Sequence, residues 1–289
     1  MNYEQRMIGF IDIIGFKSMV SESCNNTSKL DIIMKALQFL KTWEAPESFS
    51  HQAVEMEEDY QKRDEDKFNI TDKTNCTCFS DSIAVSVQVD DGSIDEAVST
   101  FIANLSLLGA ELLRNGILIR GGITIGELVH SESGIIVGPA MIEAYELESN
   151  VACYPRIILS DKLIEKLNYP CLSKRDRYPY HQYLQRFDDG CVGFHQMIFY
   201  QVQQSWIAMS QEKLELALNE IRRVIIEGLD KSFQCPSIYR KYYWLKKAYD
   251  ALIILDDSKK NFYNLNENIV NGNIHYSYTD DYYKTAELD

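Results

Sequence analysis

Hydrophobic and polar positions along the first ninety residues follow the patterns of strands and helices in turn. The run MIGFIDIIGF, residues 7–16, is almost continuously apolar, which is typical of a strand buried on both faces. Residues 27–43 repeat apolar side chains every three or four positions and predict a helix. The segment CTCFSDSIAVSV has two short apolar runs that flank Ser80, Asp81 and Ser82, so it predicts a hairpin with its tip there.

A second helix and a long strand follow, and the order of the elements predicts the fold. Ser93 and Glu96 have capping-box spacing before an apolar helical stripe that ends at Gly116. Residues 117–129, ILIRGGITIGELV, predict a strand whose glycines mark the close approach of another backbone or a ligand. Residues 156–159 predict a further strand. The order β, α, β, β, α, β is that of the split ferredoxin-like unit, so we expect an α+β fold.

The composition of the chain changes twice, and each change marks a predicted boundary. Residues 46–74 are rich in charged side chains and poor in apolar ones, so we expect a charged insertion within a first domain of residues 1–180. We expect residues 181–289 to form a C-terminal helical extension. Apolar stripes over residues 211–229 and 238–252 indicate two helices that pack on the core, with a dimerising coiled coil as the alternative.

Charge and cysteine content restrict the classes of partner. The chain of 289 residues has 29 basic and 43 acidic side chains, and its net charge of −14 argues against a general nucleic-acid binder. The seven scattered cysteines lack CxxC spacing, so we expect small buried side chains and neither disulfides nor zinc. The sequence has no apolar run of about 18 to 20 residues and no secretory signal, so we expect a cytoplasmic protein without a membrane partner.

Two aspartates lie where an acid is energetically costly. Asp12 interrupts the apolar first strand, where a carboxylate needs a cation, hydrogen bonds or protonation. Asp81 lies at the expected hairpin tip, where it can also satisfy its own turn. Each alone is as readily explained as a structural acid. Because the first strand lies beside the hairpin in this topology, we expect the two carboxylates to meet. A divalent cation that also binds the phosphates of a nucleoside triphosphate would relieve their repulsion.

The segments that contain these acids are similar to a known family. FIDIIGF, FSDSIAVS, IRGGITIGELV, GPAMIEAYELES and YPRIILS occur in that order over roughly residues 7–160. With them the chain resembles the class III nucleotidyl cyclases, and most closely the bacterial Pycsar pyrimidine (uridylate and cytidylate) cyclases of antiphage defence. The resemblance implies a palm-type catalytic core that converts UTP or CTP, with UTP favoured, to the 3′,5′-cyclic mononucleotide and pyrophosphate. It also implies two divalent cations, Mn²⁺ or Mg²⁺, and a homodimer with composite active sites.

The resemblance further assigns roles to individual residues. Purine cyclases carry an Asn and an Arg four residues apart in the helix after the glycine-rich strand, and alignment places Ile142 and Glu146 there. This departure fits the pyrimidine branch and leaves open which group stabilises the transferring phosphorus. The implied metal ligands are Asp12, Asp81 and the carbonyl of Ile13, and the implied triphosphate cradle is the main chain of Ile14, Gly15 and Phe16.

Two arginines are candidates for the missing positive charge. Arg120 is the candidate catalytic residue and Arg156 the candidate nucleotide-binding residue, and each has a plain salt bridge as its alternative. Glu143 and Glu148 are candidate anchors for such an arginine. If the glycine-rich strand lies open to a partner's nucleotide, inactive variants at Asp81 and Arg120 would complement each other in mixed dimers.

Two other functions stay open on sequence alone. A catalytically inactive, cyclase-like nucleotide-binding regulator is favoured by the missing Asn/Arg pair and disfavoured by the presence of both aspartates. A palm-type polymerase or dinucleotide synthase would use the same unit and the same paired acids, but it needs a basic second site, and the sequence has no basic cluster.

Overall fold

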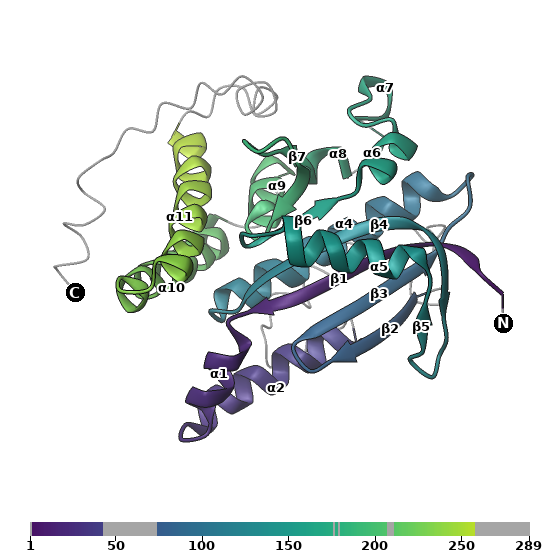
Figure 1. The fold of residues 1–289 in the computed structure, drawn as a ribbon. Helices are drawn as coiled ribbons and strands as arrows, with labels where there is room; N and C mark the ends of the chain where they lie inside the picture. Colours follow the sequence, from purple (N-terminus) through teal and green to yellow (C-terminus); the bar gives the residue numbers. More distant parts are fainter. Residues whose placement is uncertain (1, 43–73, 176, 179, 207–210, 258–289) are drawn as a thin grey trace. The chain divides into compact units, whose positions relative to one another are not determined.

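The computed structural model describes residues 2–42, 74–175, 177–178, 180–206 and 211–257. The chain forms two compact units, Met1–Met209 and Ser210–Asp289 (Figure 1). The predicted charged insertion lies outside the described residues, apart from its last position. The described part of the second unit ends at residue 257.

A mixed sheet forms the centre of the first unit (Figure 1). Its strands have the order β2–β3–β1–β4–β6–β8–β7, with β5 paired to β4, and β4 and β6 are parallel. The four strands β2–β3–β1–β4 have the order and the antiparallel pairing of the split ferredoxin-like unit, so the predicted fold class is confirmed. The strands are β1 (Glu4–Ile14), β2 (Thr74–Phe79), β3 (Ser82–Gln88), β4 (Leu118–His130), β5 (Ile136–Val137), β6 (Arg156–Leu159), β7 (Gln185–Arg186) and β8 (Val192–His195).

Helices cover both faces of this sheet because successive side chains of β1 point to opposite sides. Gly9 lies against α4, where an added Cβ would be 3.2 Å from the ring of Phe101. Phe10, the next residue, packs in a cluster with Ala140 and Ala144 of α5. The helices of the unit are α1 (Phe16–Ser23), α2 (Thr27–Thr42), α4 (Ile94–Arg114), α5 (Pro139–Glu146), the π-helical turn η2 (Leu147–Val151), α6 (Asp161–Leu167), α7 (Leu172–Arg175), α8 (Tyr180–Tyr183) and α9 (Ile198–Trp206).

Helix α4 is the core helix of the unit. Its apolar stripe is buried, at positions Ile94, Val98, Phe101, Ile102, Leu105, Leu108 and Leu112. By length and composition it would suffice to cross a membrane, contrary to the sequence-based expectation, but 72% of its most apolar window is buried inside the unit. The predicted capping box at its start is wrong, because the Ser93 hydroxyl donates to Asp90 Oδ1 (2.9 Å) and does not cap the helix.

The first unit continues beyond residue 180 because two short strands extend the sheet. β8 pairs antiparallel with β6, with Arg156 opposite His195, and β7 pairs with β8. The compact unit therefore ends at Met209, whereas the change in sequence character lies near residue 180. The sequence did not predict β7 (QR) and β8 (VGFH), because neither has the continuous apolar run that marks β6 (RIIL).

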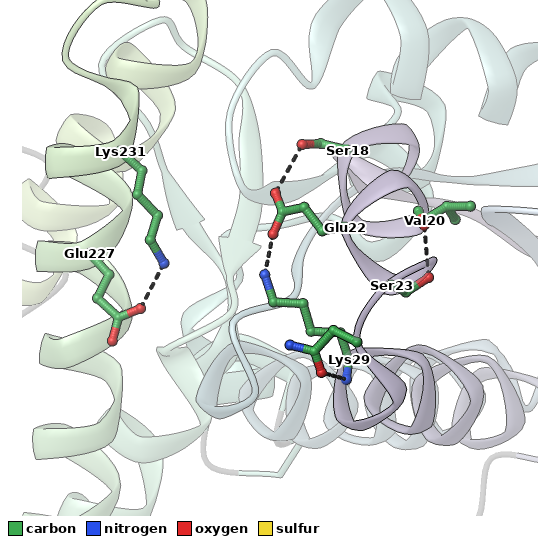
Figure 2. Close-up of polar contacts among 8 residues, drawn as sticks. Ser18, Val20, Glu22, Ser23, Lys29, Glu227 and Lys231 are labelled. Atoms are coloured by element: carbon green, nitrogen blue, oxygen red, sulfur yellow. Dashed lines mark hydrogen bonds and ion pairs between the residues drawn. The ribbon is translucent and has the colours of Figure 1, made fainter.

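The corner between α1 and α2 follows directly from the end of β1. Gly15 has a φ of 80°, a left-handed conformation that favours glycine, and α1 begins at the next residue. Figure 2 shows the Ser18 hydroxyl donating to Glu22 (3.2 Å), and Lys29 of α2 forming an ion pair with the same carboxylate. The Lys29–Glu22 pair links α1, which the sequence did not predict, to the predicted helix α2, whereas the Ser18–Glu22 bond lies within α1.

The seven cysteines, all within the described residues, are in the thiol form and lie at or near the surface. Cys24, Cys78, Cys153 and Cys235 are exposed, and the other three are partly exposed. The expectation of small buried side chains is therefore wrong. Cys76 and Cys78 belong to β2, which is at the edge of the sheet, so these side chains lack the cover that a central strand would give them.

The second unit contains α10 (Gln211–Ser232) and α11 (Pro236–Asp257), which confirms the two helices predicted there. Gly228 allows the two helices to approach closely, because an added Cβ would lie 2.1 Å from the Tyr242 ring. Along α10, Glu227 and Lys231 form an ion pair one turn apart (3.0 Å; Figure 2). The packing of this helical pair on the first unit stays a prediction.

A chain of hydrogen bonds crosses the sheet near the start of β1. Arg6 Nε donates to Ser86 Oγ (2.9 Å), which lies 2.8 Å from His130 Nδ1. His130 Nε2 lies 2.9 Å from Thr77 Oγ1, and that hydroxyl donates to the Gly134 carbonyl (3.2 Å). The chain is satisfied when Nδ1 accepts and Nε2 donates, which is a neutral imidazole. Burial, and then the charge of Arg6, lower the pKa of His130 to about 4.

We expect acid to destabilise the first unit through this histidine. The unfolded chain binds a proton at His130 below pH 6.5, whereas the folded chain does so only near pH 4, so stability is lost as the pH falls between these values. The expected loss is about 1.4 kcal/mol per pH unit in the free energy of unfolding. Urea unfolding at several pH values should give a shallower pH dependence for His130→Gln than for the wild type, and equal slopes would contradict the neutral, buried imidazole.

Candidate functional site

Asp12 and Asp81 come together at one end of the sheet, where β1 finishes beside the β2–β3 hairpin. Asp12 is opposite Ser82 in the register, so Asp81 is at the adjoining tip. The Ile13 N–H donates to the Asp81 carbonyl (2.9 Å), which ties the strand to the tip. Because the N–H and C=O of a strand residue point to the same side, the Ile13 carbonyl faces this tip as well. Both aspartate side chains are partly exposed, and a small ligand can reach them.

Arg120 and Glu148 lie beside these aspartates, and we call Asp12, Asp81, Arg120 and Glu148 the acidic cluster. Arg120 of β4 is directly opposite Asp12, and its Nε donates to Asp12 Oδ2 (3.2 Å). Its Nη2 lies 2.6 Å from Oε1 of Glu148, a residue of η2 whose side chain is only 4% exposed. One guanidinium therefore bridges two carboxylates that come from different elements. Of the two candidate anchors, Glu148 contacts this arginine, while Glu143 accepts from Thr124 (2.7 Å) and pairs with Lys162.

Burial and the neighbouring carboxylates together shift the pKa of Glu148 in the acidic cluster. Burial raises the pKa of Glu148 to about 7, Arg120 opposes this shift, and the charges of Asp12 and Asp81 add to it. The three acids are therefore close enough to repel one another. Asp81 makes no side-chain hydrogen bond or ion pair with any residue that the structure describes. Its charge is thus left without a direct counter-ion from the described part of the chain.

The donor set of the cluster suits a hard divalent cation. Within the described ranges, no three His, Cys, Asp or Glu side chains converge to form a metal site by themselves. Asp12 and Asp81 would supply two carboxylates, with the Ile13 carbonyl and phosphate oxygens as further ligands. Mg²⁺ and Mn²⁺ take such oxygen ligands, and Mg²⁺ is usually held by one or two carboxylates together with substrate phosphates. The residues present therefore fit a metal whose coordination is completed by a phosphorylated substrate.

The main chain after Asp12 offers hydrogen-bond donors beside the aspartates. Residues 14–16 turn from β1 into α1, and a Cβ added at Gly15 would meet no atom within 4 Å. The N–H groups of Ser18 and Met19 bond back to the Gly15 carbonyl. The N–H groups that precede them have no partner within the helix, as at any helix start. The predicted triphosphate cradle is therefore next to the predicted metal ligands in space as well as in sequence.

Arg156 is engaged by another acid. Its side chain is 2% exposed, its Nη1 donates to Asp189 Oδ1 (3.1 Å), and its Nη2 pairs with the second oxygen. The guanidinium also lies over the rings of Phe187 (4.8 Å) and Tyr154 (5.6 Å). The hydrogen bond from Arg156 is the main cause that lowers the pKa of Asp189. The salt-bridge alternative therefore describes this residue in the structure, and contact with a nucleotide would require release from Asp189.

The glycine-rich strand is covered by its own chain. An added Cβ at Gly122 would lie 2.4 Å from Leu147 Cβ and 2.7 Å from the Ala144 carbonyl oxygen. At Gly121 it would lie 2.7 Å from the carbonyl oxygen of Phe10 on β1. These glycines allow α5, η2 and β1 to pack closely on β4. The expectation that this strand lies open to a partner's nucleotide is therefore wrong.

Arg120 consequently lies in the same cluster as the aspartates of its own chain. Its guanidinium contacts Asp12 directly, and the charges of Asp12 and Asp81 both act on Glu148, its other partner. Variants at Asp81 and Arg120 would remove groups from one and the same cluster. Mixed dimers of these two variants are therefore not expected to complement each other.

The outer face of α5 is exposed and partly apolar. Ile142 is 62% and Tyr145 52% exposed, and Glu146 is exposed as well. Phe10 contacts Tyr145 on one side and Phe79 of the hairpin on the other, with ring centroids 5.7 and 6.2 Å apart. We call Phe79, Ile142 and Tyr145 the outer patch. The two positions aligned with the purine-type Asn and Arg thus point away from the sheet of their own chain.

The sequence did not predict the ion-pair partners of Arg156 and Arg120. The Arg156–Asp189 pair was missed, because Asp189 is in a turn with no recognisable motif. The sequence also did not distinguish Glu148 from Glu143 as the anchor of Arg120. The signal that separates them is burial, since a glutamate that follows α5 on its inward side must have a polar partner.

No family model and no curated protein matches this chain. Among solved structures, the catalytic core of a rhodopsin-guanylyl cyclase with converted specificity, in complex with ATPalphaS, is 16% identical, covers 58% of this chain and 83% of its own, and has a TM-score of 0.37. The monomeric guanylyl cyclase domain of the RhoGC fusion protein from the aquatic fungus Blastocladiella emersonii is 15% identical, with 67% and 96% covered and a TM-score of 0.38. A class III adenylyl cyclase-like ATP-binding protein from Pseudomonas aeruginosa is 12% identical, with 57% and 35% covered and a TM-score of 0.36. These likenesses are partial and concern the course of the chain alone.

Proposed function

We propose that this protein is a nucleotidyl cyclase that converts UTP, and less readily CTP, to the 3′,5′-cyclic mononucleotide with release of pyrophosphate. The observation that best supports the proposal is the meeting of Asp12 and Asp81 at the end of β1, beside the start of α1, whose first N–H groups have no partner within the helix. The reaction is that of a phosphorus–oxygen lyase. Its product would act as a cytoplasmic second messenger, in antiphage defence if the resemblance to the Pycsar cyclases extends to biological role.

We assign a separate role in cyclisation to each group of residues at the site. Asp12, Asp81 and the Ile13 carbonyl would hold divalent metal, which supplies Lewis-acid activation of the ribose 3′-hydroxyl and neutralises phosphate charge. The main chain of residues 14–16 would orient the triphosphate through its N–H groups, so that the 3′-hydroxyl and the departing pyrophosphate are in line. Arg120 would place positive charge next to the transferring phosphoryl group.

Arg120 is a better candidate for this role than Arg156. It lies against Asp12 and is partly exposed, whereas Arg156 is buried against Asp189. A group that acts on phosphate must reach the ligand without first losing a buried ion pair, and breaking such a pair costs several kcal/mol. Nucleotide binding by Arg156 is therefore the weaker part of the proposal.

The outer patch supports a homodimer as the active species. Ile142 and Tyr145 are exposed about one turn apart on α5, and the exposed Phe79 of the hairpin and Tyr145 both contact the ring of Phe10. Exposed apolar groups that lie together are typical of interaction surfaces. A second copy of the chain is the proposed occupant, and it would bring the α5 face of one subunit to the site of the other.

We expect Ile142→Asp to produce monomers and to lower turnover at least tenfold, because a carboxylate in the outer patch would be buried without a partner in the dimer. Sedimentation velocity measures the first effect and pyrophosphate release the second. Leu172→Asp is the matched control, since Leu172 is 84% exposed on α7 and is not part of the patch. A monomeric wild type with full activity would contradict the dimer.

Pyrophosphate release tests the proposed activity against its rivals. Incubation with each of UTP, CTP, ATP and GTP in the presence of Mn²⁺ should release pyrophosphate with the pyrimidine substrates. Binding of a triphosphate without release would identify the inactive regulator, which the engagement of Arg120 by two acids favours. Release with a linked dinucleotide as the product would identify the palm-type synthase.

A further inference from the structure

Arg120 forms ion pairs with two carboxylates, and metal binding at one of them would disturb that arrangement. Asp12 accepts from its Nε, and Glu148 lies against its Nη2. If Asp12 binds a divalent cation, as proposed above, that cation and the guanidinium would share one carboxylate and would repel each other as like charges. Arg120 must then move away from Asp12, or it lowers the affinity of the site for the metal.

We propose that Glu148 is a positioning residue that keeps Arg120 in the site when a divalent cation takes Asp12. The inference rests on the proposed function, because it assumes a metal at Asp12 and Asp81. Glu148 contacts Nη2 of the arginine (2.6 Å), a different nitrogen from the Nε that donates to Asp12. The guanidinium thus gives up one partner without leaving the site, and its freed donors can turn to a phosphate oxygen.

The position of Glu148 is fixed by the main chain around it. It belongs to the π-helical turn η2, and its backbone N lies 3.1 Å from where a Cβ of Gly122 would be. The absence of a side chain at Gly122 therefore lets this turn press directly on β4, two residues from Arg120. π-Helical turns of this kind are frequent at functional sites. Burial of the Glu148 side chain keeps its ion pair with Arg120 from being screened by water.

Without Glu148, the ion pair of Arg120 that remains in the described cluster is the one with Asp12, and the guanidinium competes with the metal for that carboxylate. We therefore expect Glu148→Gln to weaken Mn²⁺ binding about tenfold, measured without nucleotide by isothermal titration or electron paramagnetic resonance. In an Arg120→Gln background the competitor is gone, and the same substitution should change Mn²⁺ affinity less than about threefold. Glu143→Gln is the matched control, because Glu143 lies on α5, directly before η2, but pairs with Lys162.

A shorter carboxylate separates positioning from a general effect of negative charge. Glu148→Asp keeps the charge and the burial but shortens the side chain by one methylene, so it cannot span the distance to Arg120. If Glu148 acts by holding the arginine, Glu148→Asp weakens Mn²⁺ binding as Glu148→Gln does. If Glu148 acts only through its negative charge, Glu148→Asp binds Mn²⁺ like the wild type, and the inference is overturned.

The design also distinguishes failure of this inference from failure of the proposed function. Mn²⁺ binding that is absent from the wild type, or unchanged in Asp12→Asn, overturns the metal site and the inference together. Mn²⁺ binding that depends on Asp12, with equal effects of Glu148→Gln in both backgrounds, overturns the positioning role alone. Thermal melting of each variant confirms that the compared proteins are folded.

Discussion

Replacement of Asp12 or Asp81 by asparagine is expected to lower turnover at least about 100-fold while the chain stays folded. Asparagine keeps the shape of each side chain but removes the negative charge that would hold the metal, so the loss falls on the chemical step. Steady-state pyrophosphate release measures the loss, and circular dichroism with thermal melting measures folding. Asp31→Asn, an exposed acid on α2, is the matched control and should keep wild-type turnover.

The two aspartates should differ in their effect on stability. Asp81 has no side-chain partner in the described residues, so Asp81→Asn should leave the free energy of unfolding unchanged or raise it slightly. Asp12→Asn removes a partly exposed pair with Arg120, which is worth about 1 kcal/mol or less. Wild-type turnover in either variant would contradict the metal-binding role. A drop of several kcal/mol would instead indicate a structural acid.

The base of the triphosphate is expected to have a large effect on kcat/KM. We expect kcat/KM for UTP or CTP to exceed that for ATP or GTP at least about 100-fold, because a pocket sized for a pyrimidine excludes the larger ring and leaves its own polar groups unpaired with the wrong base. UTP is expected to lead CTP. The exposed, apolar Ile142 at the position of the purine-type Asn is consistent with a changed ribose contact.

Competition at equal concentrations of all four triphosphates measures this preference without assuming a substrate. A product mixture dominated by cyclic AMP or cyclic GMP would overturn the pyrimidine assignment. It would leave the roles of Asp12 and Asp81 intact, since the metal ligands act on the phosphates that all four substrates share.

The features that the sequence predicted correctly are those with a local pattern. The apolar run around Asp12, the hairpin tip at Asp81 and the helical stripe of α4 each follow from periodicity within about twenty residues. Topology then brought Asp12 and Asp81 together, because the split βαβ unit places the first strand beside the hairpin. Thus the fold class and the meeting of the two aspartates were predictable.

The features that the sequence could not predict depend on contacts between distant segments. Arg156 pairs with Asp189, 33 residues away, and Arg120 pairs with Glu148 rather than Glu143. Both choices are decided by how β6, β8 and η2 pack, and no periodic pattern records that. The cover over Gly122 was missed for the same reason, because a glycine in a strand marks close approach without naming the approaching group.

The mass of the product formed by the wild-type chain from UTP and CTP with Mn²⁺ tests the central claim most directly. The account predicts a 3′,5′-cyclic pyrimidine mononucleotide, formed together with one pyrophosphate per turnover and absent from the Asp12→Asn reaction. An unchanged triphosphate, or a linked dinucleotide in place of the cyclic mononucleotide, would contradict it.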